Sequence, residues 1–146
     1  MQFYRLLARF AVIILLITAG LKLCESTQPN FYFQEPDSVV QFLTNRQLLF
    51  VAAGLEIIVA VYVWFTASQK KRSFVLLWFC SIVALYKFGR YYTRAVYPCS
   101  CLGILESWLK LTWNQTDTIS WLVLVFLAVF SIAHLLHEKL KSQTRP

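Results

Sequence analysis

Four long apolar stretches, separated by short polar segments, set the pattern of this chain. They cover about residues 6–23, 47–67, 73–92 and 119–136. At about 1.5 Å per helical residue, each is long enough to cross the ~30 Å hydrocarbon core of a membrane. The pattern predicts an all-α polytopic membrane protein, one domain over residues 1–146, in which four transmembrane helices form an antiparallel bundle.

The polar segments predict two outer loops and one inner turn. The loops cover residues 24–46 and 93–118, and the basic turn covers residues 68–72. Within the first loop, Asp37 or Ser38 is expected to cap one or two turns of helix lying on the membrane surface.

The first apolar stretch also has features of a cleaved signal peptide, because a basic start precedes it and small residues follow it. A lipoprotein signal would place a small residue before the cysteine, and here Leu23 precedes Cys24. We therefore expect a helix that is retained.

Composition agrees with a membrane protein. The chain is 58% hydrophobic and only 14% charged, which is too apolar for a soluble domain of this length. The net charge of +7 comes from short basic clusters that flank the apolar stretches. Such clusters indicate contact with membrane lipid and a topology signal, and no nucleic-acid-binding motif accompanies them.

The positive-inside rule predicts the orientation. It places both termini in the cytoplasm and both long loops outside, which in a bacterium means the inner membrane with the loops in the periplasm. The basic residues that favour this orientation are Arg5, Arg9, Lys70, Lys71, Arg72, Lys139, Lys141 and Arg145. Those that oppose it from the outer side are Lys22, Arg46, Lys87, Arg90, Arg94 and Lys110.

Two cysteines one residue apart, Cys99 and Cys101, lie in the second outer loop between a proline and Gly103. A disulfide within a C-x-C pair closes a small, strained ring, and strained exposed bridges exchange readily. The residues after Gly103 predict a short amphipathic interfacial helix, whose N-terminal end would lower the pKa of a nearby thiol. The pattern favours thiol redox chemistry, with a structural bridge or a metal site as alternatives.

The other two cysteines have simpler interpretations. Cys24, at the outer end of the first stretch, would serve as a resolving thiol if it reached the pair, or else as a small packing residue. Cys80 lies in the middle of the third stretch, and we assign it to packing.

Glu56 interrupts the second apolar stretch. A carboxylate inside a membrane span usually faces the bundle interior and has a partner. Depth along the helices favours Lys87 as that partner, with Lys22 or a protonated Glu56 as alternatives. The group would either fix the order of the helices or form a proton-relay or quinone site.

Two further pairs of polar residues share a helix face. Arg90 and Arg94, one turn apart, would hold the thiolates anionic, bind an acidic partner or lipid head group, or anchor the helix at the interface. His134 and His137 would permit a metal or haem contact, but at the end of a span we expect them at the membrane surface and predict no metal site.

Three short sequences together resemble the MauE/DoxX group of redox-associated membrane proteins. They are Gly20-Leu21-Lys22-Leu23, Gly54-Leu55-Glu56 and, after a basic turn, Pro98-Cys99-Ser100-Cys101-Leu102-Gly103. The resemblance covers roughly residues 6–136 and implies a four-helix bundle, distantly similar to vitamin K epoxide reductase, that supports disulfide formation in exported partners.

The same resemblance implies roles for individual residues. Cys99 and Cys101 would be the redox pair, and Lys22 and Glu56 would be the intramembrane polar positions. Relatives often carry a further cysteine or a proline between the two cysteines. Here the proline precedes the pair, which leaves the direction of electron transfer open.

We therefore expect a thiol–disulfide redox protein that works with an exported, thioredoxin-like partner. Cys101 is the expected nucleophile because it lies nearer the following helix. Membrane quinone remains an open candidate as electron carrier, although no quinone motif is visible. The alternative is a small non-catalytic subunit that supports the structure or assembly of a larger membrane complex.

Overall fold

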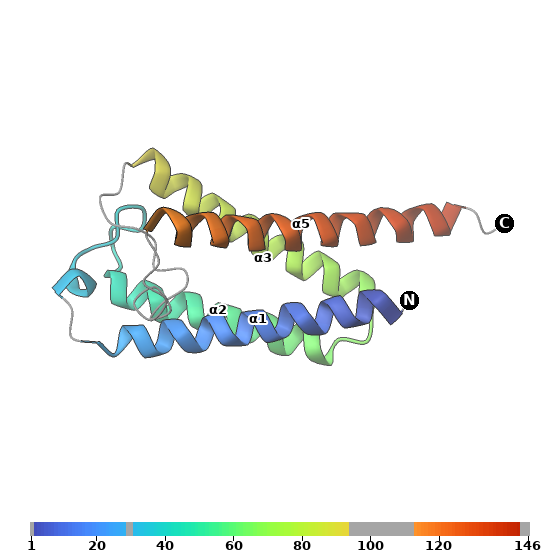
Figure 1. Ribbon diagram of the computed structural model, residues 1–146, viewed down its shortest axis with the longest axis horizontal. Helices are drawn as coiled ribbons and strands as arrows, with labels where there is room; N and C mark the ends of the chain where they lie inside the picture. The colour runs from blue at the N-terminus through green and yellow to red at the C-terminus, as the bar shows by residue number, and fades with distance from the viewer. Residues whose placement is uncertain (1, 29–30, 94–112, 144–146) are drawn as a thin grey trace.

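A computed structural model describes residues 2–28, 31–93 and 113–143 of the chain. Within these ranges the protein is helical, and four helices are long and apolar enough to cross a membrane. This confirms the predicted helical class and the four candidate membrane spans. The elements are α1 (Gln2–Ser26), the 3₁₀ helix η1 (Phe31–Gln34), α2 (Asn45–Phe65), α3 (Gln69–Tyr92) and α5 (Trp113–Gln143) (Figure 1).

The helices extend beyond the apolar stretches because polar residues complete their ends. At the start of α2, the Thr44 hydroxyl accepts a hydrogen bond from the Gln47 amide at 3.3 Å, and the Gln47 side chain accepts one from the Thr44 amide at 3.0 Å. This capping box starts the helix at Asn45. The polar residues from Trp113 onward likewise belong to α5, so Asp117 lies on the helix.

The basic cluster between the second and third spans also proves helical. Only residues 66–68 separate α2 from α3, and Gln69 begins the third helix. The three basic residues of this cluster therefore occupy the first turn of α3, where Lys70 and Lys71 are exposed.

Helices α1 and α2 pack against each other along much of their length. Small side chains line this contact, and they let two helix backbones approach closely where there is no water to drive association. The buried alanines of the two helices are Ala8, Ala11, Ala19, Ala53 and Ala60.

Helices α3 and α5 form a second pair, which polar contacts hold near both ends. The Ser73 hydroxyl and His134 Nδ1 lie 2.9 Å apart, near the start of α3. Towards the other end, Lys87 Nζ donates to Asp117 Oδ1 at 2.6 Å, and its ammonium lies 5.3 Å from the centre of the Trp121 ring. These two contacts each join a polar group of one helix to a partner on the other, whereas the hydroxyl of the buried Ser131 on α5 has no hydrogen-bond partner among the described residues.

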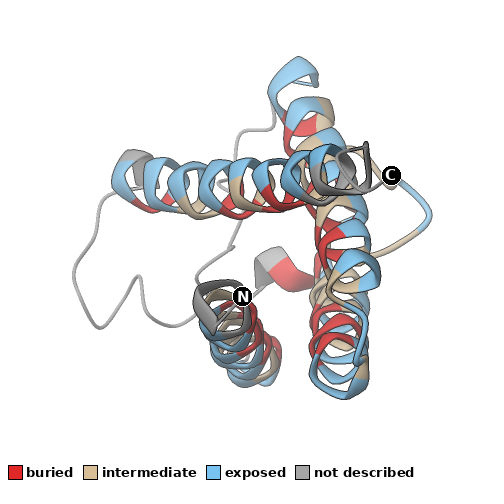
Figure 2. Ribbon diagram, turned by 90° about the vertical axis from the view of Figure 1, so that its right-hand side faces the viewer, coloured by how far each residue is buried: buried red, intermediate tan, exposed pale blue. Residues whose placement is uncertain are grey.

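The two helix pairs contact each other much less extensively than the helices within each pair do. Figure 2 views α1 nearly end-on, whereas α5 runs across the same view, so α5 is tilted relative to α1. The buried residues face the inside of this arrangement, while the outward faces of all four helices are exposed and largely apolar.

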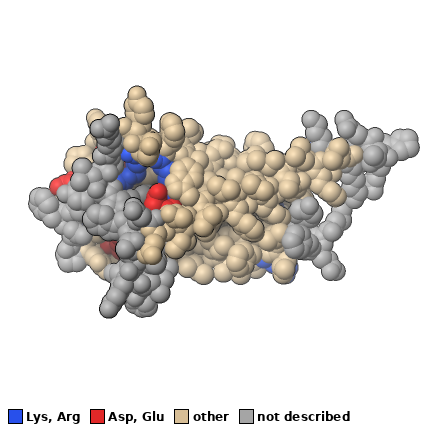
Figure 3. All heavy atoms as spheres, turned by 45° about the horizontal axis from the view of Figure 1, so that its top comes forward, with Lys and Arg blue, Asp and Glu red and all other residues tan. Residues whose placement is uncertain are grey.

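The molecule has two distinct ends (Figure 1). The loop end contains residues 27–28 and 31–44, the end of α3 and the start of α5. The terminal end contains the start of α1, residues 66–68 and the end of α5. On the face shown in Figure 3, charged side chains gather towards the loop end, and uncharged side chains cover the middle.

A closed loop, residues 35–45, lies over the loop end. Pro36 and Thr44 pair as an isolated bridge, and the Asn45 amide donates to the Glu35 carbonyl at 3.0 Å. The Asp37 side chain accepts from the Val39 and Val40 amides at 2.9 and 3.0 Å. Asp37 therefore caps a turn, as expected, although residues 38–43 form turns and bends and not a helix.

Gly89 allows this loop to sit on α3. A Cβ atom at Gly89 would lie 3.1 Å from Val39 Cγ1, closer than ordinary packing permits. We expect Gly89→Leu to destabilise the protein by about 1–3 kcal/mol, because it forces the loop away from the helix. Unfolding in mixed detergent micelles would measure the change.

Gly54 supplies the matched control, since a Cβ there would meet no atom within 4 Å. Gly54→Leu should leave stability unchanged or raise it slightly, because glycine inside a helix is unfavourable. Equal losses for the two variants would contradict a docked loop.

Candidate functional site

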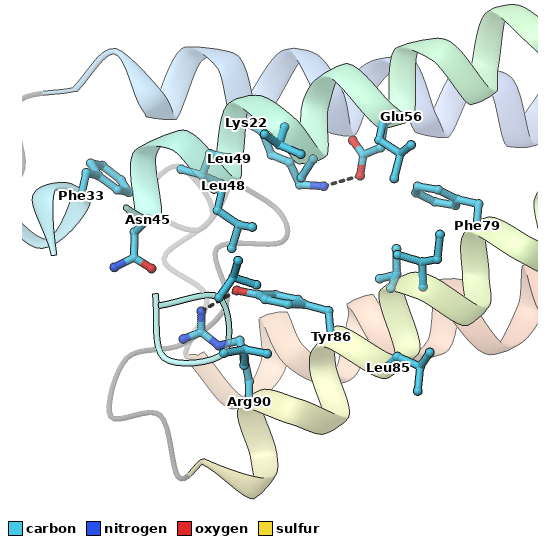
Figure 4. A pocket seen from close by; sticks show the side chains of 17 residues that line it. Lys22, Phe33, Asn45, Leu48, Leu49, Glu56, Phe79, Leu85, Tyr86 and Arg90 are labelled. Atoms are coloured by element: carbon cyan, nitrogen blue, oxygen red, sulfur yellow. Dashed lines mark hydrogen bonds and ion pairs between the residues drawn. The ribbon is translucent and has the colours of Figure 1, made fainter. Parts of the chain in front are cut away.

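A cavity of about 470 Å³ lies between the two helix pairs, in the half of the molecule near the loop end. Its walls are α2 and α3, and residues of η1 and the 35–45 loop cover it. The lining is almost wholly apolar, and Figure 4 shows polar side chains on two opposite sides of it. Among the described residues, the polar ones that line it are Lys22, Asn45, Glu56, Tyr86 and Arg90.

On one side, Lys22 of α1 donates a hydrogen bond to Glu56 Oε1 of α2 (Figure 4). Thr18, one turn before Lys22, donates to Glu56 Oε2 at 3.0 Å. Both carboxylate oxygens are therefore bound, and both charged residues are buried. Such a pair is stable within a membrane span because each charge neutralises the other.

The predicted Glu56–Lys87 pair is wrong, and the alternative partner, Lys22, is correct. Lys87 faces α5 and pairs with Asp117. Depth along a helix does not reveal which face a residue occupies, whereas the close packing of α1 on α2 brings Lys22 directly against Glu56.

On the other side of the cavity, Arg90 and Tyr86 of α3 hold the loop through Asp37. The Tyr86 hydroxyl donates to Asp37 Oδ2 at 2.8 Å, and Arg90 Nη1 lies 3.4 Å from the same oxygen. Arg90 Nη1 also donates to the Tyr86 hydroxyl at 3.2 Å. We call these three residues the Asp37 clasp.

The clasp keeps Asp37 ionised although the residue is only 1% exposed. Burial alone would raise the pKa of Asp37. Hydrogen bonds from the Val40 and Val39 amides and from the Tyr86 hydroxyl, together with the Arg90 charge, hold it below its ordinary value of 3.8. Arg90, predicted to contact a thiolate, an acidic partner or lipid, thus has an internal carboxylate as its partner.

Two further predicted site residues, Cys24 and Cys80, do not line the cavity. Cys24 lies exposed in the last turn of α1, and Cys80 is buried among apolar side chains, as assigned. Cys99, Cys101, Arg94 and the predicted interfacial helix lie outside the described residues.

His134 differs from the expectation of a membrane-surface residue, since it is buried between α3 and α5 beside Ser73. His137, by contrast, is exposed. Within residues 2–28, 31–93 and 113–143, no three His, Cys, Asp or Glu side chains lie together in a way that would hold a metal.

Comparison with protein families, with curated proteins and with solved structures finds nothing that matches this chain. An apolar cavity with hydrogen-bonding groups on opposite sides is the usual form of a small-molecule site, and its volume falls within the range of roughly 300–1,000 Å³ typical of such sites.

Three residues of the site were not expected from the sequence: Thr18, Tyr86, and Asp37 as a partner of α3. One signal was present for Tyr86, because it lies one helical turn before Arg90 and so shares its face. No comparable signal joins Asp37 to α3, since Asp37 and Tyr86 are 49 positions apart in the chain.

Proposed function

We propose that this chain is a membrane-embedded thiol–disulfide redox protein that acts with an exported partner through Cys99 and Cys101. The supporting observation is the position of the two helix ends that flank the cysteine pair in the sequence. Tyr92 ends α3 and Trp113 begins α5, both at the loop end, away from the apolar middle of the helices. The sequence resemblance to the MauE/DoxX group supports the same function.

The proposed orientation places the loop end in the periplasm and both termini in the cytoplasm of a bacterial inner membrane, with the four helices as an antiparallel bundle. Three of the six basic residues that opposed this orientation have structural partners that account for them. Lys22, Lys87 and Arg90 each pair with a carboxylate, whereas Lys70 and Lys71 at the other end are exposed. The exposed cations therefore favour a cytoplasmic terminal end.

The proposed reaction is a two-step exchange. The Cys101 thiolate attacks a disulfide of the partner, forming a mixed disulfide while the second partner sulfur leaves as a thiolate. The Cys99 thiolate then attacks Cys101 Sγ, which releases the reduced partner and leaves a Cys99–Cys101 disulfide. Run backwards, the same steps oxidise the partner and return the dithiol, so the chemistry is balanced in both directions.

Trapping the intermediate tests this proposal. We expect Cys99→Ser to accumulate a mixed disulfide with an exported thioredoxin-like protein, because the resolving thiol is gone, and Cys101→Ser to form none. Non-reducing electrophoresis after acid quenching would detect the adduct, which reductant should remove.

The buried Cys80 provides the control, since it packs in the apolar core and Cys80→Ser should change no adduct. Cys24→Ser should alter only the lifetime of the adduct if Cys24 passes the disulfide onward. Absence of any adduct, with co-purifying membrane subunits that depend on this chain, would contradict the proposal and favour the structural-subunit alternative.

A further inference from the structure

The Lys22 ammonium lines the cavity between α2 and α3, and the residues around it accept fewer hydrogen bonds than it can donate. Lys22 carries three N–H groups, and its only hydrogen bond to other described residues is with Glu56. The residue is 8% exposed. Apolar residues form most of the surrounding wall, and an unmet N–H group there is unfavourable. An acceptor atom entering the cavity would satisfy it.

The cavity opens sideways. Two of its lining residues are strongly exposed, Val51 of α2 at 56% and Leu85 of α3 at 71%. Both are apolar and both lie in helices long enough to cross a membrane. The opening between them therefore faces hydrocarbon when the helices span a bilayer, and a lipid-soluble molecule would enter without crossing water.

The charges around the cavity favour an uncharged ligand. Glu56 already neutralises Lys22, and Asp37 neutralises Arg90 across the cavity. Among the residues that line the cavity, a ligand anion would meet Glu56, and a ligand cation would meet Lys22 or Arg90. In an apolar environment, either repulsion would be strong.

We propose that this cavity binds an uncharged amphiphile from the membrane. Its carbonyl or hydroxyl head accepts a hydrogen bond from Lys22, and its hydrocarbon tail leaves between Val51 and Leu85. The binding does not depend on the thiol exchange proposed above. Two sources share this chemistry, a quinone and a neutral glyceride, and the experiment distinguishes them.

The test measures binding by the full chain in phosphatidylcholine nanodiscs. The probes are decylbenzoquinone and monoolein as neutral ligands, with dodecyl phosphate and dodecyltrimethylammonium as charged ones. We expect saturable binding of at least one neutral probe, at least tenfold tighter than either charged probe. Charged probes that bind as tightly as the neutral ones would overturn the proposal.

A matched pair of variants tests whether the ligand binds in this cavity. Ala52 lines the cavity, and Ala52→Phe should fill it and weaken binding at least tenfold. Ala133 is exposed on α5 away from the cavity, and Ala133→Phe should bind as the unmodified chain does. Equal affinity of the two variants would contradict binding in this cavity.

Labelling of the unmodified protein keeps the test decisive if Ala52→Phe fails to fold. A neutral probe with a diazirine in its tail should mark peptides of α2 and α3 around Val51 and Leu85. Labelling confined to α5 would overturn the proposal.

The thiol-exchange proposal and the cavity proposal can be tested independently. Binding of the neutral probe should persist in the Cys99→Ser, Cys101→Ser double variant, which cannot exchange disulfides. If decylbenzoquinone binds and monoolein does not, the occupant is a redox carrier that would exchange two electrons with the dithiol. Binding of monoolein with equal affinity identifies a neutral lipid instead, and the cavity proposal stands.

Discussion

Replacing Glu56 with leucine should destabilise the protein by about 3–5 kcal/mol, because it leaves the Lys22 ammonium buried in a membrane span without a counter-charge. Replacing both partners, as Lys22→Met and Glu56→Leu, should restore stability to within about 1 kcal/mol, since apolar residues of similar size fill the same space. Reversible unfolding in mixed detergent micelles would give the four free energies of the double-mutant cycle.

A second cycle with Lys87 is the control. Lys87 pairs with Asp117, so the effects of Lys87→Met and Glu56→Leu should add within about 0.5 kcal/mol. A large coupling between Glu56 and Lys87, with none between Glu56 and Lys22, would contradict the pairing described here. Thr18 remains satisfied in the first double variant, because its hydroxyl also bonds the Ile14 and Leu15 carbonyls.

Releasing the Asp37 clasp should have the next-largest effect. We expect Asp37→Asn to destabilise the protein by about 3 kcal/mol, because it leaves Arg90 buried without its carboxylate. The 35–45 loop should then separate from α3 and become sensitive to protease. Glu35→Gln is the matched control, since Glu35 holds the loop through its backbone carbonyl.

The clasp should also respond to acid. The folded-state pKa of Asp37 lies below its ordinary value of 3.8. The ionised carboxylate therefore makes its full contribution to the free energy of unfolding above pH 3.8, and this contribution is lost as pH falls through the folded-state pKa. The difference in unfolding free energy between the unmodified chain and Asp37→Asn should therefore shrink below about pH 3.8. A difference that stays constant down to pH 2 would contradict an ionised Asp37.

The four membrane spans could be predicted because continuous apolar stretches have few alternative structures. The helix ends could not be placed from hydropathy alone, since Thr44 with Gln47 and the polar residues after Trp113 extend helices beyond the apolar stretches. Polar residues form the terminal turns of these helices, and hydropathy does not distinguish a polar helical turn from a polar loop.

The partners within the site were harder to predict than its polar residues. Glu56, Lys22 and Lys87 stood out as charges inside spans, but their pairing depends on which helix faces which. His134 was misassigned for the same reason, because its burial depends on a serine 61 residues away in sequence. Such contacts arise from tertiary packing, which one sequence does not specify locally.

The division into two helix pairs coincides with the middle of the chain, since residues 66–68 separate α2 from α3. A ribosome therefore completes the first pair before it makes the second. The alanine-rich contact of α1 with α2, and the Lys22–Glu56 bond beside it, need no residue from the later half. The first pair can thus neutralise its own buried charges during insertion. Helices α3 and α5 would then pack against an α1–α2 pair that is already folded.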